Sequence, residues 1–387
     1  MLKLAKKLEG FEESTIREMT RKAIVNQAIN LSQGMPDFEP PKELIEGIME
    51  AIEKKEHQYS ITYGNYNLRE KISEKLREYN GIEVDPEDEI TVCCGASEGI
   101  SSSILSILNP ADEVIIFEPW YENYTPITHI AKGVPKYVQL KQEDFSIDEE
   151  KLKEKITNKT KAIIVNSPHN PSGKVFSSKE MKLIADICID NDIVAITDEI
   201  YEYIIYDGEK HISLGSIPGM EERTITISGF SKTFSITGWR IGYVAAEKKL
   251  MKGIRKVHDY LTVCAPSILQ YAAIKAFDLK EDYFSQLVKR YQKNRDYLSK
   301  SLNKLGFKTI IPKGAYYMFS DISNFEMRDT DFADFIVKNK GVAVVPGSSF
   351  YHSINNENIG CNYVRFSFSQ KIETLEEAIF RLEERLL

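Results

Sequence analysis

Short apolar runs alternate with amphipathic helical stretches through the middle of this chain. Each apolar run is only a few residues long and ends in turn residues, as a buried strand does, whereas the stretches between them repeat apolar residues every three or four positions. Strands are expected at 89–93, 113–117, 162–166, 193–198, 224–228 and 243–246, with helices such as 97–108 and 178–191 between them. This alternation predicts an α/β fold with a mostly parallel sheet covered by helices on both faces.

A second, smaller domain is expected after this region. A chain of 387 residues is long for a single hydrophobic core, and a long amphipathic helix at 281–305 separates the α/β region from the C-terminal part of the chain. Further strands are expected at 315–320, 342–345 and 364–369, and a last helix at 375–386. Because chain ends often lie close together, we expect residues 1–40 to join a small domain at 281–387, with a large domain at 41–280.

Charge and cysteine content narrow the class of protein. The chain has 50 basic and 58 acidic residues, a net charge of −8, which speaks against a nucleic-acid-binding surface. No apolar run is long enough to span a bilayer, and the first residues lack the apolar core of a signal peptide. The five cysteines are scattered without metal-ligand spacing. We therefore expect a cytoplasmic protein with reduced thiols, no metal site and no membrane partner.

The segment SGFSKTFSITGWRIGY, residues 228–243, carries the first chemical signal. Lys232 lies between small and hydroxyl residues, and Arg240 stands eight positions later. Such a lysine suits an imine with an aldehyde cofactor, and the arginine suits the phosphate of that cofactor. A loop followed by a strand would give the same pattern, so the segment gains its meaning from the rest of the chain.

Two other segments come after expected strands and suit other parts of a flat, phosphorylated cofactor. Gly95, Ala96 and Ser97 open a helix, whose first backbone N–H groups form an anion site, although Ser97 would equally serve as an N-cap. A flat aromatic of the turn 119–121 (Pro-Trp-Tyr) would stack on a planar ring at the carboxyl edge of the sheet, or would simply be a buried loop aromatic.

Three polar side chains complete the pattern. Asn170 lies in NSPHNPSG, where two prolines restrict a turn. Asp198 ends an apolar strand, with Tyr201 one turn later, and a buried carboxylate there needs either a protonated pyridine nitrogen or an arginine as its partner. Arg365, in the strand 364–369, presents a two-donor fork that suits a substrate carboxylate, unless it is an ordinary surface charge.

Taken together, these segments resemble the class I aminotransferases of the pyridoxal-phosphate fold-type I superfamily. The resemblance spans nearly the whole chain, because eight motifs occur in the family's order: LSQGMPDFEPP, YSITYGNYNLR, CGASEG, EPWYENY, NSPHNPSG, TDEIYE, SGFSKTFSITGWRIGY and VRFSF. Within the family the chain is most similar to kynurenine/glutamine-type, aromatic and prokaryotic aspartate aminotransferases. The resemblance implies a seven-stranded, mostly parallel sheet between helices, a smaller α+β domain and pyridoxal 5'-phosphate as cofactor.

The resemblance also assigns roles to individual residues. It makes Lys232 the Schiff-base lysine and the group that moves the proton, and it makes Asp198 the partner of the pyridine nitrogen. The other residues that it places at the cofactor are Gly95, Ala96, Ser97, Tyr121, Asn170, Tyr201, Ser228, Ser231 and Arg240. It assigns the substrate α-carboxylate to Arg365, with Gly34 and Asn170 nearby. Tyr59 resembles the tyrosine that reaches the phosphate of a neighbouring subunit, which implies a homodimer with shared active sites.

The sequence departs from the family pattern at two positions. Gly229 stands where many relatives have a serine three residues before the lysine, so the hydroxyl for the phosphate would come from Ser228 or from Ser231. Ala96 stands where prokaryotic aspartate-type members often have a lysine, and the segment 260–266 contains no arginine or lysine. The second departure argues against a strict dicarboxylate specialist.

The resulting expectation is an aminotransferase that moves an amino group from an L-amino acid to a 2-oxo acid, with 2-oxoglutarate as the expected acceptor, by a ping-pong mechanism. The donor is expected to be aromatic, kynurenine-like or glutamine-like, or the range to be broad. The alternatives are a cysteine-S-conjugate β-lyase, which acts on compounds such as cystathionine, and an aspartate aminotransferase. A cofactor-binding regulator of transcription is disfavoured, because the chain is acidic and carries no additional DNA-binding domain.

Overall fold

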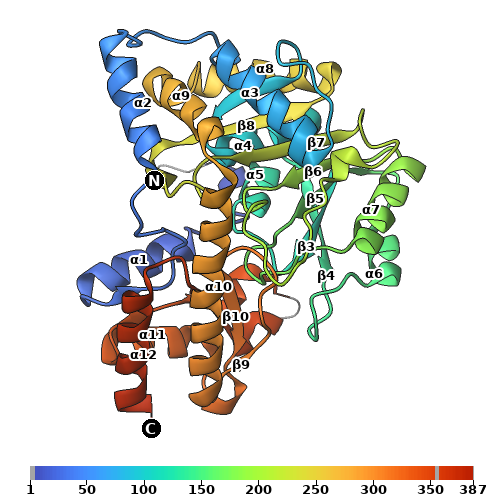
Figure 1. Ribbon diagram of the computed structural model, residues 1–387. Helices are drawn as coiled ribbons and strands as arrows, with labels where there is room; N and C mark the ends of the chain where they lie inside the picture. The colour runs from blue at the N-terminus through green and yellow to red at the C-terminus, as the bar shows by residue number, and fades with distance from the viewer. Residues whose placement is uncertain (1–4, 354–356, 387) are drawn as a thin grey trace.

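A seven-stranded sheet forms the centre of the larger part of the molecule (Figure 1). The computed structural model describes residues 5–353 and 357–386. The strands of this sheet, in spatial order, are β2 (Ile90–Cys94), β8 (Ile241–Ala246), β7 (Thr224–Gly229), β6 (Val194–Asp198), β5 (Thr160–Asn166), β3 (Glu113–Glu118) and β4 (Val134–Gln139). Neighbouring strands from β7 to β4 pair in parallel, whereas β8 is antiparallel to both β2 and β7. The predicted α/β fold with a mostly parallel sheet is therefore confirmed.

Helices cover both faces of this sheet because strand residues alternate between two apolar layers. On β3, Val114 and Ile116 pack in the layer of α4 and α8, and Ile115 and Phe117 pack in the layer of α7. The helices of this part are α2 (Lys42–Glu53), α3 (Tyr66–Lys75), α4 (Ala96–Ile107), α5 (Tyr124–Ile130), α6 (Glu149–Lys155), α7 (Ser178–Asp190), α8 (Lys248–Thr262) and α9 (Ser267–Ile274). A capping box of Ser177 and Glu180 begins α7.

The sequence did not predict the edge strand β4. Its residues are mostly half-buried or exposed, and Val138 is its one fully buried residue. An edge strand buries less apolar surface than a central strand, so its sequence (VPKYVQ) lacks a continuous apolar run. Its pairing with β3 instead places it in the sheet.

The smaller part contains a four-stranded sheet and combines residues from near the start of the chain with residues from its last third. Its strands are β12 (Val345–Pro346), β13 (Tyr363–Ser367), β10 (Tyr317–Asp321) and β9 (Lys308–Thr309), and its helices are α1 (Thr15–Val25), α10 (Glu281–Lys304), α11 (Asp329–Asn339) and α12 (Ile372–Leu386). A separate parallel pair joins β1 (Ile29–Asn30) to β11 (Val342–Ala343). Figure 1 shows α10 running from the larger part down to the smaller part, beside α12. The chain's early residues thus pack with its last third, while the domain boundaries themselves stay predictions.

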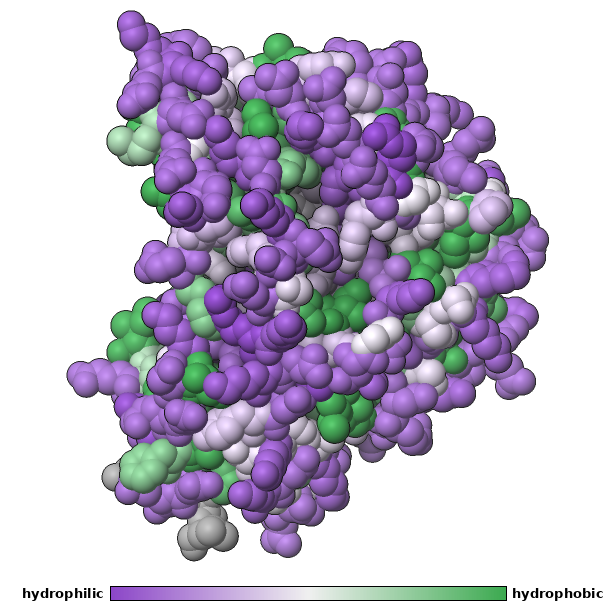
Figure 2. Space-filling view, viewed as in Figure 1, coloured by the Kyte–Doolittle hydropathy of each residue, from purple (hydrophilic) through white to green (hydrophobic). Residues whose placement is uncertain are grey.

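Short helical turns connect the main elements, at Lys6–Leu8, Leu76–Asn80, Leu214–Ser216, Thr237–Trp239, Lys275–Asp278, Ser323–Phe325, Gly347–Phe350 and Ile359–Asn362. The face seen in Figure 2 is mainly hydrophilic, with hydrophobic residues in separate groups. Among the described helices, none combines the length and the apolar character that crossing a membrane requires.

Strand directions gather polar residues at one edge of the large sheet. The parallel strands β5 and β6 end there with Asn166 and Asp198. Because β8 runs the opposite way, its first residues lie at this same edge, and Arg240 directly precedes them. Strand β2 is antiparallel to β8, so its carboxyl end and Gly95 also lie there. Ligands of α/β proteins bind at such an edge.

Candidate active site

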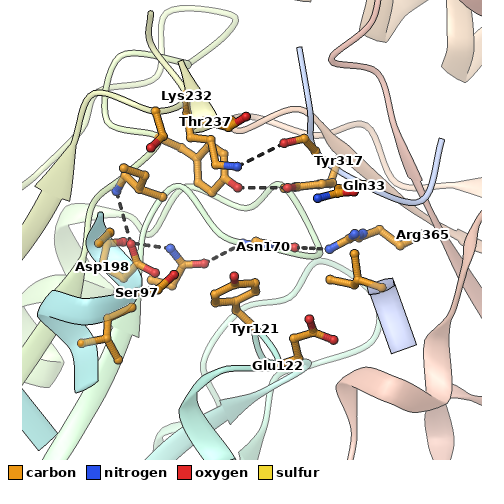
Figure 3. Close-up of a pocket in the computed structure, with 18 of the residues that line it drawn as sticks. Gln33, Ser97, Tyr121, Glu122, Asn170, Asp198, Lys232, Thr237, Tyr317 and Arg365 are labelled. Carbon is orange, nitrogen blue, oxygen red and sulfur yellow. Dashed lines mark hydrogen bonds between the residues drawn. The ribbon is translucent and has the colours of Figure 1, made fainter. Parts of the chain in front are cut away.

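A cavity of about 430 Å³ lies at this edge, between the large sheet and residues of the smaller part (Figure 3). Most of the residues singled out from the sequence line it. They are Gly34, Ala96, Ser97, Tyr121, Asn170, Asp198, Tyr201, Ser231, Lys232, Arg240 and Arg365. The segments that carry them are far apart in the sequence, so the fold brings them together around one space.

The amine of Lys232 reaches into the cavity from the loop after β7. Its Nζ donates a hydrogen bond to the backbone oxygen of Gly34, at 3.1 Å. Burial, together with the charges of Arg240 and Arg365, lowers the pKa of Lys232 to about 8, although Asp198 acts in the opposite direction. A lysine with this pKa has a substantial neutral fraction near physiological pH, and the neutral amine is the nucleophile.

Asp198 is a buried carboxylate that has no cation as a direct partner. Its Oδ2 accepts a hydrogen bond from the hydroxyl of Tyr124 at 2.7 Å, and its Oδ1 accepts a longer one from the backbone N–H of Ile200. Burial raises the pKa of Asp198 to about 6, and the Tyr124 hydrogen bond partly opposes this rise. Within residues 5–353 and 357–386, Asp198 forms no salt bridge to an arginine, which was one of the two partners left open by the sequence.

Arg365 is a buried cation at the opposite side of the cavity. One guanidinium nitrogen donates to Oδ1 of Asn170 at 2.8 Å and another donates to the backbone oxygen of Ser32, whereas Nε has no hydrogen-bond partner. The side chain is fully buried, so it is not the surface charge that the strand pattern also allowed. No carboxylate of the described residues pairs with it. A buried guanidinium without an anion is a ready site for a ligand carboxylate.

Asparagine side chains connect the two charged groups. Asn166 donates from Nδ2 to the backbone oxygen of Asp198 at 2.8 Å, and its Oδ1 accepts the backbone N–H of Asn170 at 2.7 Å. Asn170 in turn accepts the hydrogen bond from Arg365. Figure 3 shows this chain of hydrogen bonds running between Asp198 and Arg365. Each amide orientation is therefore fixed by its neighbours.

The start of α4 and Arg240 form a positively polarised end of the cavity. Gly95 is the residue before α4 and has a φ of +75°, so Ser97 lies inside the helix and is not the N-cap. A Cβ at Gly95 would collide with the guanidinium of Arg240, which shows how closely the helix start and the arginine approach. Ser97 and Ser231 line the same cavity. Backbone N–H groups at a helix start, hydroxyls and a guanidinium suit a phosphate.

Three of the residues predicted from the sequence do not line the cavity. Ser228 donates its hydroxyl hydrogen to Glu202 at 2.6 Å and is buried away from the cavity, whereas Ser231 lines it. Gly95 faces the guanidinium of Arg240 and does not itself line the cavity. Tyr59 is 82% exposed on the surface of this single chain.

Tyr121 lines the cavity, and its neighbour Trp120 does not. Trp120 is buried and stacks on Tyr137, with ring centroids 4.6 Å apart. Tyr121 meets Tyr124 edge to face at 5.7 Å, which leaves its ring at the cavity wall, where Figure 3 shows it below Asn170. The aromatic turn therefore supplies one ring to the core and one to the cavity.

Sequence reasoning missed several residues that line the cavity or contact one of its lining residues. Tyr124 binds Asp198, and Tyr317 places its hydroxyl 3.0 Å from that of Tyr201. Arg17, from the first turn of α1, lines the wall together with Glu122. Arg17 and Tyr317 belong to no motif recognised in the sequence, and the motif EPWYENY, which contains Glu122 and Tyr124, does not reveal what these two side chains contact. The packing of α1, α5 and β10 around the cavity reveals them. The hydroxyl of Ser14, which caps α1, donates to Glu122 and fixes the helix start at the cavity.

Comparisons with known proteins agree with this geometry. A family model described as "Aminotransferase class I and II" matches residues 26–382. The aromatic-amino-acid aminotransferase 2 of Thermococcus litoralis is 36% identical, over 99% of this chain and 98% of that protein. The human kynurenine–oxoglutarate transaminase 1 is 35% identical, over 96% of both chains. The solved structure of an aspartate aminotransferase from Thermus thermophilus with maleate has a TM-score of 0.93 and 31% identity, over all of both chains.

Proposed function

The chain belongs to the class I and II aminotransferases, whose members use pyridoxal phosphate, and from this premise we propose how it works. We propose that the cavity around Lys232 binds pyridoxal 5'-phosphate and that the amino group of an aromatic or kynurenine-like L-amino acid passes to 2-oxoglutarate. The observation that carries the proposal is the position of Lys232 in one cavity with a buried carboxylate, a buried guanidinium and an anion-binding helix start.

The residues present fit this cofactor. Lys232 would hold its aldehyde carbon covalently. The phosphate would bind at the start of α4, with Ser97, Ser231 and Arg240 as side-chain donors. Tyr121 would cover one face of the ring, and Asn170 and Tyr201 would bind the ring hydroxyl. When bound, the cofactor accepts the electron pair that remains after a proton leaves the substrate Cα.

Asp198 is suited to a cationic ring nitrogen. The nearest hydrogen-bond donors of Asp198 are a hydroxyl and a backbone amide, and neither neutralises its charge. A protonated nitrogen would supply the missing counter-charge and would keep the buried carboxylate ionised, against the burial that raises its pKa. In this arrangement the carboxylate stabilises the positive nitrogen throughout the reaction.

Lys232 is the group positioned to move the proton. With substrate bound, the free amine of Lys232 would take the proton from the substrate Cα as a general base and would later release it as a general acid. The lowered pKa of Lys232, about 8, makes the amine a base that works near neutral pH. Arg365 would hold the α-carboxylate, and the backbone of Gly34 would approach it closely, since a Cβ there would collide with Tyr317.

The acceptor assignment rests on Arg17. Position 96 is an alanine and offers no cation. Arg17, in the first turn of α1, instead brings an exposed cation to the cavity wall. Arg17 would bind the distal carboxylate of 2-oxoglutarate while Arg365 binds the α-carboxylate. The human relative is named as a kynurenine–oxoglutarate transaminase, which supports this acceptor. The relatives are named as transaminases, so the β-lyase alternative is not favoured. Aspartate stays an alternative donor.

We also propose that the active unit is a homodimer. Besides Tyr59, the neighbouring Ile61 and Tyr66 are half exposed, and Tyr260 is 92% exposed. Exposed apolar side chains of this kind are often covered by a partner subunit. A second copy of the chain would cover it and would receive Tyr59 at its phosphate.

The test is the visible spectrum of the purified protein with pyridoxal phosphate, recorded while single amino acids are added. We expect an imine band that aromatic amino acids and kynurenine bleach and that 2-oxoglutarate restores. A band that no amino acid bleaches would refute the transamination proposal while keeping the cofactor. Absence of the band would refute the role of Lys232. Pyruvate release from cystathionine without an acceptor would establish the β-lyase instead.

A further inference from the structure

A second cavity, of about 410 Å³, adjoins the segment that carries Lys232. Ser231 and Lys232 line the catalytic cavity, whereas Gly229 and Phe230, the residues just before them, line the second one. The other walls come from α3 and the turn after it, from the turn at Lys275–Asp278 and from the first turn of α10. Its volume is in the range of small-molecule sites, and the proposed transamination does not use it.

Aromatic rings form most of its walls. Tyr79 stacks on Tyr203 with ring centroids 4.4 Å apart, and Tyr203 lies 4.7 Å from Phe284. Phe230 and Phe234 continue this aromatic wall. Tyr79 is 44% exposed, so part of the aromatic surface faces solvent within a recess. Aromatic faces in such a recess favour a flat ligand.

The cavity already holds one ammonium group. Nζ of Lys75 lies 5.3 Å from the ring centroids of Tyr79 and Tyr203, so the electron-rich faces of these rings attract a cation. The charge of Lys75 is neutralised by Glu202, at 2.5 Å. The side chain of Lys75 therefore shows which kind of group this wall binds, and its charge is not available for an anionic ligand.

The remaining charges are negative. Lys71, the other cation of the lining, is paired with Glu74 at 2.7 Å. Glu281, in the first turn of α10, lines the cavity, is exposed and forms no ion pair among the described residues. Burial is the main cause of the raised pKa of Tyr203, and the charge of Glu281 adds to it, which places this carboxylate near the aromatic wall. Glu78 also lines the cavity, and its carboxylate lies 3.7 Å from the guanidinium of Arg77.

We propose that this second cavity binds a small aromatic cation, an aryl ring that bears an alkylammonium group. The ring lies against Tyr203 and Phe284, and the ammonium lies between Glu281 and the tyrosine faces. An aromatic anion is disfavoured, because both lining lysines are already paired, and Glu281, the lining charge that forms no ion pair among the described residues, is a carboxylate.

The probe is benzyltrimethylammonium, added to the cofactor-loaded enzyme in a calorimeter. Its nitrogen carries no hydrogen, so it cannot condense with the cofactor aldehyde, as a primary amine would. We expect saturable binding of one probe per chain, with weaker binding of tetramethylammonium, which lacks the ring, and of benzyl alcohol, which lacks the charge. Absence of saturable binding, or equal binding of the three compounds, would overturn the proposal.

Substitutions in the wall of the second cavity test whether the probe binds there. We expect Glu281→Gln to weaken binding about three- to fivefold and Phe284→Leu to weaken it as well, since leucine fills space without an aromatic face. The matched control is Asp282→Asn, which removes a carboxylate from the same turn at a residue that does not line the cavity. Transaminase activity checks that each variant is folded. Unchanged affinity in both test variants, or displacement of the probe by phenylacetate, which Arg365 would attract, would place the probe elsewhere and refute the site.

Discussion

The hydroxyl of Tyr124 donates a 2.7 Å hydrogen bond to the buried carboxylate of Asp198. The two residues lie 74 positions apart, one in the first turn of α5 and the other at the end of β6. This hydrogen bond stabilises the ionised carboxylate, whereas burial destabilises it. Tyr124 therefore helps to keep Asp198, which is proposed to hold the cofactor nitrogen, in its ionised form.

Tyr124→Phe should shift the acidic limb of the pH–activity profile. Without the hydrogen bond, the pKa of Asp198 rises, so a larger fraction is protonated near neutral pH. We expect the acidic limb of kcat/KM to shift to higher pH and the activity at pH 7 to fall about tenfold. Tyr137→Phe is the control, because its hydroxyl bonds Thr125, well away from Asp198 in the hydrogen-bond network, and its half-buried ring stacks on Trp120. Identical pH profiles for wild type and Tyr124→Phe would contradict the role of this hydrogen bond.

Lys232 should react as a neutral amine at unusually low pH. Its pKa is lowered to about 8, so in the cofactor-free protein its modification by formaldehyde and cyanoborohydride should be half-maximal near pH 8. Peptide mass spectrometry measures this labelling, with the other lysine peptides as internal references. Because the charge of Arg240 contributes to the lowering, Arg240→Gln should move the midpoint to higher pH. A midpoint near that of an ordinary lysine, about 10, in the wild type would show that the amine is not perturbed.

Arg17→Gln should discriminate between acceptors. If Arg17 binds the distal carboxylate of 2-oxoglutarate, the substitution should raise the KM for 2-oxoglutarate about five- to tenfold and leave that for phenylpyruvate nearly unchanged. Steady-state kinetics with both acceptors and one donor measure this. Arg21→Gln is the control, because Arg21 lies one turn later on α1 and is paired with Glu13 outside the cavity. Equal effects on the two acceptors would exclude a selective contact.

Substitution of the two candidate serines should affect different properties of the protein. Ser231 lines the cavity, so Ser231→Ala should weaken cofactor affinity about fivefold, the value of one hydrogen bond. Ser228 instead binds the buried Glu202, so Ser228→Ala should lower the free energy of unfolding by about 1–2 kcal/mol with little effect on affinity. Equilibrium dialysis and thermal melting separate the two effects. The opposite pattern would make Ser228 the phosphate ligand.

His258→Gln should reduce stability mainly at low pH. Burial disfavours the charged imidazole, but Glu98 at 3.0 Å outweighs this and raises the pKa of His258. The stabilisation is therefore fully present below the unfolded value of about 6.5 and is lost as pH rises through the folded pKa. We expect a loss of about 2 kcal/mol near pH 6 and a smaller loss near pH 9. Urea unfolding at one protein concentration measures it, with the exposed His57→Gln as control. A loss that does not change with pH would mean that His258 is neutral.

Much of the fold was predictable from the sequence because local signals and the final structure agree. The central strands are continuous apolar runs, and the helices at Ser178–Asp190 and Glu281–Lys304 were predicted to within one residue at each end. The edge strand β4 was not, because a half-buried strand carries no such run. The site residues recognised in motifs mostly line one cavity, whereas Ser228 does not, since a hydroxyl in a motif does not reveal which way it points.

The sequence by itself determined the α/β architecture and the family, and it singled out Lys232 as the candidate reactive lysine, because periodicity and motifs are properties of neighbouring residues. Only the tertiary structure decided that Tyr124 binds Asp198, that Arg365 is buried and pairs with no carboxylate of the described residues, and that Arg17 reaches the same cavity. These contacts join segments that are distant in the chain, and local patterns do not encode their distances. The pKa values of Lys232 and Asp198 depend on the same contacts, since burial and neighbouring charges exist only once the chain has folded.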